Sequence, residues 1–321
     1  MNVAARLCVI GSLLSFGALA AASVYGSGTS APASVSQILK AVQASQSLQK
    51  LPTGLQPDLS NTSDVAQVPG NGAPTQYKCK AAGPNQDNIP AYAFGECVYG
   101  DPAGKKLMIV YGDSHGEMWS SAMATLAAKM GWRLENFNLP GCPAPDLNFI
   151  SYQTNAANTQ CTTFHKIAPL AIRAQHPNLV VVTSESTQDV AVGKSATPAQ
   201  WQSGLLATFR QLKGVGARVV MIGDIPGWQN DNANCLAAHE SSVQDCASVA
   251  AQALSPDLGA ERTAALKSGA QYVSVTPWIC AAKCEPVIAK YRVYLDEHHL
   301  TGAFVQYLSG ALGQTLKLPA G

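Results

Sequence analysis

The chain has 321 residues, of which 47% are hydrophobic and 13% charged, and its formal net charge is +1. A chain of this length can bury a full core as one large domain, or as one domain with an extension. The near-zero net charge and the absence of basic runs argue against nucleic acid as a partner.

The first 24 residues have the composition of an export signal. Arg6 precedes an apolar stretch at residues 7–24, and the small residues at 18–22 suit a signal peptidase. The same stretch is long enough for an uncleaved anchor, since a membrane-spanning helix needs roughly 17–25 residues. Residues 1–24 are therefore predicted to be a signal peptide or an N-terminal membrane anchor. Either way the rest of the chain is secreted or held in an extracytoplasmic, periplasm-like envelope space, with membrane contact only through this segment.

Cysteine usage agrees with an oxidising compartment. One of the nine cysteines, Cys8, lies inside the apolar N-terminal stretch, and the others form an even set, as in disulfide-bonded exported proteins. Pairing between neighbours closes the shortest loops, although other connectivities stay open. A zinc site is disfavoured because no Cys-x-x-Cys pair has a matching second pair. The predicted disulfides are Cys79–Cys97, Cys142–Cys161, Cys235–Cys246 and Cys280–Cys284.

Residues 25–78 are rich in Ser, Ala, Gln, Pro and Gly. Apolar residues at helical spacing in residues 34–48 predict one short amphipathic helix. The prolines and glycines that follow indicate loop structure. We interpret this region as an extended arm lying on a domain that occupies residues 79–321. The alternative is a flexible spacer from the membrane.

From Lys106 onward, apolar runs alternate with helical patterns. Such alternation predicts an α/β fold, a three-layer α/β/α sandwich around a parallel central sheet of about five strands. In folds of this kind, ligands bind beyond the carboxyl ends of the strands. The strands are expected at residues 106–112, 132–139, 176–186, 217–226 and 270–278, and the main helices at 116–131, 164–175, 198–216 and 258–269.

The stretch "VYGDSHGEMW" places polar residues at the end of the first of these strands. Ser and Asp are favoured helix caps, and a strand-to-helix turn needs a cap. Ser114 alone is therefore weak evidence of chemistry, and Asp113 is expected to bond the amides of the turn. His115 could line a site or simply pack after the serine, and Trp119 is expected in the core.

A second polar group lies near the C-terminus, in "VYLDEHHLTGAF". Asp296 and His299 are three residues apart, a spacing at which a turn can bring a carboxylate to one imidazole nitrogen. A serine nucleophile needs such a pair, because the imidazole takes the hydroxyl proton while the carboxylate fixes the tautomer. His298 could replace His299, and a surface cluster without function is the structural alternative.

These residues resemble a known superfamily. "YGDSHG" and "DEHHLTG" are similar to the first and last blocks of the SGNH/GDSL hydrolases, in which a GDS serine pairs with a late Asp-x-x-His. "GCPAP" and "GDIPGWQNDNANCL", the run "WICAAKCEPVIAKYRVYLDEHHLTGAF" and the arm segment "LPTGLQPDL" most resemble the SGNH domain of membrane acyltransferase-3 proteins. The resemblance extends from about residue 35 to the end of the chain.

The resemblance implies a catalytic triad at matching positions. Ser114 would be the nucleophile, His299 the base and Asp296 the orienting acid. The tetrahedral oxyanion needs preorganised donors, and the backbone N–H of Ser114 is one candidate because it begins a helix. Gly141, near the second block, could donate another bond or simply form a turn.

Some residues depart from the family pattern or bear on the site less directly. The asparagine of the third block has no clear counterpart, because Thr183 and Ser184 stand near its place, which leaves the oxyanion hole incompletely assigned. His115 could contact substrate. Asp224, at the end of the fourth strand, could border the cleft.

The resemblance implies serine-dependent acyl transfer or ester hydrolysis, through an acyl-serine intermediate, on a cell-envelope glycan or glycolipid. A separate membrane acyltransferase is a plausible partner, because the chain has no multi-span region that could import an acyl donor. No cofactor or metal is needed in this scheme. The alternatives are a catalytically weak accessory protein of an envelope acylation system and a generic secreted esterase or lipase.

Overall fold

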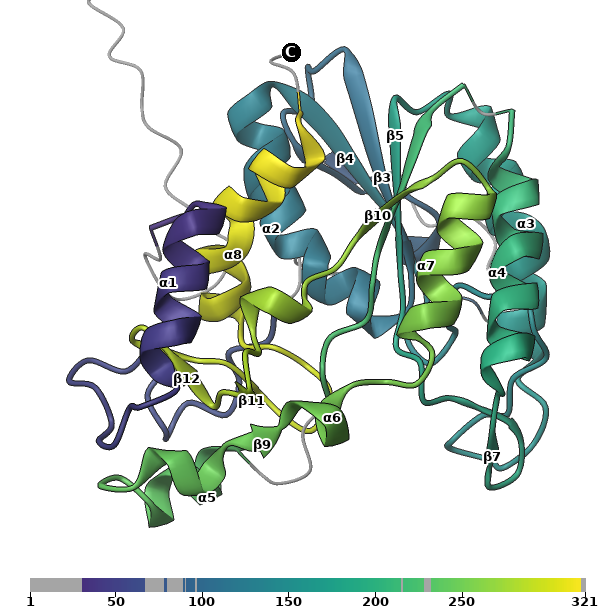
Figure 1. The fold of residues 1–321 in the computed structure, drawn as a ribbon. Coiled ribbons are helices and arrows are strands. Elements are labelled where there is room, and N and C mark those ends of the chain that lie inside the picture. Colours follow the sequence, from purple (N-terminus) through teal and green to yellow (C-terminus); the bar gives the residue numbers. More distant parts are fainter. Residues whose placement is uncertain are drawn as a thin grey trace, which may run out of the picture.

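The computed structural model describes residues 31–66, 78–79, 89, 91–95, 97–214, 216–227 and 232–318. The predicted export signal therefore lies outside the described residues. The chain folds around a seven-stranded sheet with the strand order β1-β2-β4-β3-β5-β8-β10 (Figure 1). These strands are β1 (Lys78–Cys79), β2 (Cys97–Gly100), β3 (Lys106–Gly112), β4 (Trp132–Asn138), β5 (Leu179–Thr183), β8 (Arg218–Ile222) and β10 (Gln271–Val273).

Five neighbouring strands, β4, β3, β5, β8 and β10, run parallel, which confirms the predicted parallel sheet. Two features differ from the prediction. β1 and β2 extend one edge in antiparallel pairing, which the short run of residues 97–100 did not reveal. The last strand is shorter than predicted, because residues 276–278 form a 3-10 helix. Pro277 has no N–H to donate to a ladder, so it cannot extend the strand there.

Helices cover both faces of the sheet, which confirms the three-layer sandwich (Figure 1). One face carries α1 (Val35–Ser45), α2 (Ser114–Met130) and α8 (Gly302–Leu316), and the other α3 (Thr159–Ala174), α4 (Pro198–Leu212) and α7 (Leu258–Lys267). Successive β3 side chains alternate between the layers: Met108 and Val110 join the first core, and Leu107 and Ile109 the second. Trp119 is fully buried in the first core, as predicted.

Several short elements complete the fold, mostly beyond the sheet in the lower part of Figure 1. They are α5 (Asn232–Ala238), α6 (Ala250–Ala253), the 3-10 helices at Ala91–Phe94, Val243–Cys246 and Thr276–Trp278, and the strands β6 (Asp189–Ala191), β7 (Lys194–Ser195), β9 (Ser248–Val249), β11 (Lys283–Cys284), β12 (Val287–Ile288) and β13 (Tyr291–Arg292).

The helix predicted within residues 34–48 is present as α1, which Ser34 begins with a capping box. The chain that follows α1 is held against the domain by hydrogen bonds. Buried Arg292 donates to the carbonyl oxygens of Asp58 and Asn61. Asp64 accepts bonds from the backbone at the start of α8. Residues 31–66 therefore lie on the domain as an ordered arm.

Three of the four predicted disulfides are present: Cys142–Cys161, Cys235–Cys246 and Cys280–Cys284. Cys97 is also disulfide-bonded, and the backbone register places Cys79 opposite it across β1 and β2. The side chain of Cys79 lies outside the described part of the chain, so the Cys79–Cys97 bond stays a prediction.

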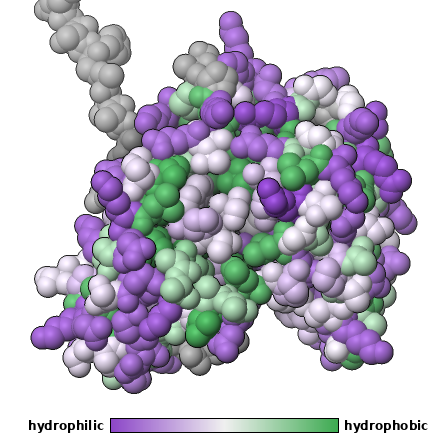
Figure 2. Space-filling model, viewed as in Figure 1, coloured by the Kyte–Doolittle hydropathy of each residue, from purple (hydrophilic) through white to green (hydrophobic). Residues whose placement is uncertain are grey.

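The surface in the view of Figure 1 is mixed in character. Hydrophilic side chains dominate its edges, and apolar ones lie in smaller groups between them (Figure 2). Within the residues that the structure describes, no helix is both long and apolar enough to cross a bilayer.

Candidate active site

Ser114 is the first residue of α2 and directly follows the carboxyl end of β3. Asp113 caps the helix: one carboxylate oxygen accepts the N–H of His115 at 2.9 Å, and the other accepts the N–H of Glu185 at 2.9 Å. Asp113 therefore bonds the amides of the turn, as predicted, and ties the loops after β3 and β5 together. Burial raises its pKa to about 7 against the opposing attraction of His115.

Two glycines allow the close packing around this turn. A Cβ added to Gly112 would overlap the carbonyl oxygen of Thr183 on β5. A Cβ on Gly116 would stand 2.3 Å from the side-chain oxygen of Asn138. Both positions therefore need glycine for steric reasons, and the start of α2 is pressed against β4 and β5.

Asp296 and His299 form the predicted hydrogen-bonded pair. Nδ1 of His299 lies 2.9 Å from Oδ2 of Asp296, whereas Nδ1 of His298 is 3.8 Å from Oδ1. The backbone N–H groups of both histidines donate to Oδ1. Partial burial opposes the charge of Asp296, but the bonds from the His299 ring and these amides outweigh it and hold its pKa well below the usual range. The geometry thus selects His299 over His298 as the partner of the carboxylate.

Ser114, His299 and Asp296 line one cavity of about 200 Å³, which we call the serine cavity. Its remaining walls are largely apolar, although they include the carboxyl group of Glu117, whose pKa burial raises to about 7. Ser114 is separated from Asp296 by 182 positions in the sequence. The fold nevertheless places Ser114 and the Asp296–His299 pair in the wall of the same cavity. The other lining residues are Val65, Ala66, Glu117, Met118, Leu295 and Leu300.

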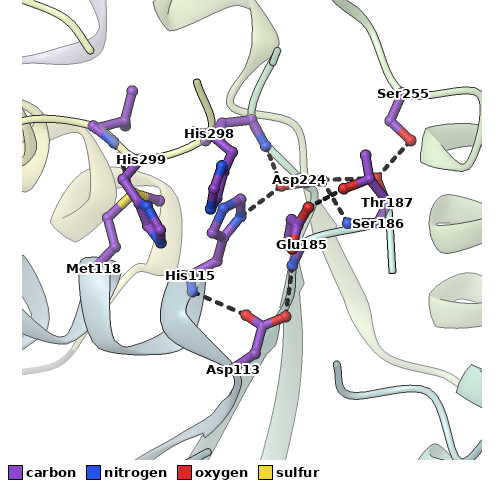
Figure 3. Close-up of polar contacts among 12 residues, drawn as sticks. Asp113, His115, Met118, Glu185, Ser186, Thr187, Asp224, Ser255, His298 and His299 are labelled. Atoms are coloured by element: carbon purple, nitrogen blue, oxygen red, sulfur yellow. Dashed lines mark hydrogen bonds and ion pairs between the residues drawn. The ribbon is translucent and has the colours of Figure 1, made fainter. Parts of the chain in front are cut away.

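His115 belongs to a different polar cluster (Figure 3). Its Nδ1 lies 2.8 Å from Oδ1 of Asp224, and Oδ2 of Asp224 accepts bonds from the N–H and hydroxyl of Ser186. Burial alone would lower the pKa of His115, but the negative charge and hydrogen bond of Asp224 raise it to about 9. The buried contact with Asp224 therefore favours the protonated form of the His115 ring.

The three histidines pack against one another. The ring of His115 lies under that of His298, with centroids 6.0 Å apart, and 5.4 Å from the ring of His299 (Figure 3). The His298 and His299 centroids are 4.2 Å apart. Burial and the electrostatic interaction with the neighbouring His299 ring lower the pKa of His298. His298 is thus favoured in its neutral form.

A second cavity of about 360 Å³, here called the polar cavity, opens beside this cluster. Sequence reasoning anticipated Asp224 at its border but missed Glu185, Ser186 and Thr187. Their position directly after a parallel strand was the available signal. The lining residues are His115, Glu185, Ser186, Thr187, Asp224, Ile225, Gly227, Gln252, Ala253, Leu254, Ser255, Pro256, Glu297 and His298.

Three predicted residues do not line either cavity. Gly141 has a positive φ of 70°, and its carbonyl oxygen accepts a bond from Asn158, so it forms a turn here. Thr183 and Ser184 are fully buried, and their hydroxyls have no hydrogen-bond partner among the described residues. Any part of these three in an oxyanion hole remains a prediction.

Among the residues that the structure describes, two clusters carry side chains of metal-ligating types. Cys142 and Cys161 approach His165, but the two sulfurs are joined in a disulfide and cannot act as thiolate ligands. Asp296, His298 and His299 have ligand atoms within 4.8 Å of one another. There the Asp296 carboxylate already accepts the backbone N–H groups of both histidines and bonds the ring of His299.

Comparison with known proteins gives a family and a fold. Residues 78–314 match the family model described as "SGNH domain (fused to AT3 domains)". The periplasmic domain of a lipopolysaccharide acetyltransferase from Salmonella ser. Paratyphi A is similar in structure, with a TM-score of 0.54 and 16% identity over 67% of this chain and 85% of that chain. A GDSL-like lipase from Bacteroides thetaiotaomicron has a TM-score of 0.41 and 11% identity over 66% of this chain and 88% of that chain. No curated protein matches in sequence.

Proposed function

Because this chain belongs to the family of SGNH domains that are fused to AT3 domains, we propose that Ser114 is the nucleophile of an acyl transfer reaction, with His299 as its base and Asp296 as the orienting carboxylate. The protein is an enzyme of the serine esterase or acyltransferase type. The observation that carries the residue assignment is the 2.9 Å pair of His299 and Asp296 in the wall of the cavity that Ser114 also lines.

In the first half-reaction, Ser114 Oγ attacks the carbonyl carbon of an acyl ester. The new C–O bond forms as His299 takes the hydroxyl proton through Nε2, because Nδ1 faces Asp296. The carbonyl oxygen becomes an oxyanion. When it reforms the carbonyl, the bond to the alkoxy group breaks, and the leaving oxygen receives the proton from His299. The product is an acyl-serine and a free alcohol.

In the second half-reaction, a hydroxyl group of the acceptor gives its proton to His299 and attacks the acyl-serine. The new ester forms and Ser114 regains its proton. Water as the acceptor would make the protein an esterase, and a sugar hydroxyl would make it an O-acyltransferase. The same groups serve both reactions, so the acceptor alone decides between them.

The start of α2 offers one donor for the oxyanion. The backbone N–H of Ser114 is an N-terminal helix amide with no hydrogen-bond partner among the described residues. His115 and Glu117 direct their N–H groups to Asp113 instead. The positive end of the helix dipole adds to the stabilisation of negative charge at this point.

The proposed acceptor is a glycan or glycolipid of the cell envelope. The carboxylate of Glu185 and the hydroxyl groups of Ser186, Thr187 and Ser255 give the polar cavity groups that suit sugar hydroxyls. The three disulfides favour an extracytoplasmic location. A separate membrane acyltransferase is the proposed donor of the acyl group, since members of this family are fused to AT3 domains.

Hydrolysis of p-nitrophenyl acetate tests the nucleophile. We expect Ser114→Ala to lower kcat by at least about 10³-fold, and the exposed serine variant Ser203→Ala on α4 to leave it unchanged. A fluorophosphonate should label the wild type at Ser114, located by peptide mass spectrometry. Equal hydrolysis by wild type and Ser114→Ala, with no labelling, would instead favour a non-catalytic accessory role.

A further inference from the structure

The wall of the serine cavity includes two residues of the N-terminal arm. Val65 and Ala66 come from the arm, whereas every other lining residue comes from α2 or from the turn before α8. Ala66 is 3% exposed, and Val65 is 43% exposed and lies at the rim. The arm therefore closes one side of the cavity that contains Ser114.

The arm is fixed at this point by its backbone. The N–H of Gly302 donates to the carbonyl oxygen of Asp64 at 2.8 Å, and the N–H of Ala303 donates to its carboxylate at 2.9 Å. Val65 pairs with Thr301 in an antiparallel bridge. A Cβ on Gly302 would come within 3.2 Å of the Asp64 side chain, so the arm and the start of α8 are in close contact.

The opposite wall is fixed as well. The sulfur of Met118 accepts the N–H of Leu300 at 3.2 Å, and the N–H of Leu295 donates to the carbonyl oxygen of His299 at 2.8 Å. The apolar side chains of the cavity are thus held in place on the arm, on α2 and on the turn that carries His299. A group bound there meets walls of defined position.

The size and character of the cavity indicate its occupant. An apolar cavity of about 150 Å³ can hold a benzene molecule, so about 200 Å³ leaves room for a short acyl chain and none for a lipid chain. Apolar walls suit the hydrocarbon part of an acyl group. Apart from Glu117 and the three groups proposed to react, the residues that line this cavity have apolar side chains, whereas the polar cavity offers several partners for the hydroxyls of a sugar.

We propose that the serine cavity is the acyl subsite and that Val65 and Ala66 of the arm set its length, so that the enzyme accepts acyl groups of about two to four carbons. This inference rests on the proposed function, because it takes Ser114 as the nucleophile. It assigns the arm a role in specificity as well as in packing. The occupant is a short-chain acyl ester, positioned with its carbonyl carbon at Ser114.

A series of p-nitrophenyl esters tests the proposal. For the wild type, kcat/KM should fall at least tenfold between butyrate and hexanoate. Ala66→Leu places a branched side chain in the cavity, so the butyrate-to-acetate ratio of kcat/KM should fall by at least tenfold, since one methylene in a tight pocket is worth about 10-fold or more. Val65→Ala should raise the hexanoate-to-acetate ratio about threefold.

Ala44→Leu is the matched control, because Ala44 is an exposed alanine on α1 of the same arm; it should leave both ratios unchanged. Thermal unfolding checks that each variant folds. If Ala66→Leu does not fold, the proposal is tested with Val65→Ala alone. Ester hydrolysis that depends on Ser114 but keeps the wild-type length profile in both variants overturns the acyl subsite alone. Hydrolysis that does not depend on Ser114 overturns the proposed function with it.

Discussion

The serine cavity and the polar cavity each have one of two consecutive histidines in their walls. His299 lines the first and His298 the second. The difference between them comes from Asp296, which bonds the ring of His299 at 2.9 Å but leaves His298 at 3.8 Å. Hydrogen bonding to one carboxylate, and not residue type, thus distinguishes His299, the proposed base, from His298.

The two cavities also differ in how they hold charge. In the serine cavity, Asp296 is partly exposed and is stabilised as a carboxylate by hydrogen bonds. In the polar cavity, His115 and Asp224 form a buried ion pair, with further bonds from Ser186 to the carboxylate. In the first arrangement the bond to Asp296 is made through Nδ1 of His299, whereas in the second the contact with Asp224 raises the pKa of His115.

The largest expected effect separates the two histidines. His299→Ala should lower kcat for p-nitrophenyl acetate by at least about 10³-fold, because it removes the proposed base. His298→Ala should lower kcat less than about tenfold, since the His298 ring lies 3.8 Å from Asp296 and makes no hydrogen bond to its carboxylate. Steady-state kinetics of the two variants measure the difference. A larger loss in His298→Ala would reverse the assignment of the two residues.

A smaller effect concerns the pH dependence of stability. The pKa of His115 is about 9 in the folded protein and has its ordinary value of 6.5 in the unfolded chain, so the native state holds this proton more tightly. The protonated His115 ring therefore stabilises the native state fully below pH 6.5, and this stabilisation is lost as the pH rises through 9. The difference between the folded and unfolded pKa values of His115 corresponds to about 3 kcal/mol in the free energy of unfolding. Denaturant unfolding between pH 6 and 10 should show this loss in the wild type.

His115→Gln should flatten this part of the pH profile, because glutamine does not titrate. His176→Asn, at an exposed histidine with a positive φ, should keep the wild-type slope, since asparagine tolerates that backbone conformation. Asp113 and Glu117 also have raised pKa values, near 7, so the loss of stability that they cause develops as the pH rises from about 4 through 7 and is complete above about pH 8. The slopes are therefore compared between pH 8 and 10. An unchanged slope in His115→Gln would show that the ion pair with Asp224 does not govern stability there.

Much of the fold could be predicted from sequence, because its cause is local. The apolar runs of β3 and β5 are buried on both faces, and Thr197 begins α4 with the capping box that its sequence indicates. The spacing of Asp296 and His299 was equally informative, because two residues three positions apart in a turn can reach each other without help from the rest of the fold. The short antiparallel strands β1 and β2 gave no such signal, because their pairing depends on the partner strand.

The polar cavity and the arm could not be predicted in the same way. Ser186 bonds Asp224 because β5 and β8 are neighbours in the sheet. Ala66 reaches the serine cavity through long-range bonds between Asp64 and α8. Composition and periodicity describe how a segment folds, but not which distant segment it meets.

The smallest expected effect concerns the acceptor. Glu185→Gln keeps the size of the side chain but removes the charge, and bonds to a charged group are worth about 1.5 kcal/mol or more. Acetyl transfer from p-nitrophenyl acetate to chitotetraose or xylotetraose, followed by mass spectrometry, should therefore need about tenfold more acceptor. Glu240→Gln, at an exposed glutamate, should match the wild type. If Glu185→Gln slowed hydrolysis and transfer by the same factor, its carboxylate would support Ser114 and not the sugar, and the division between the two cavities would fail.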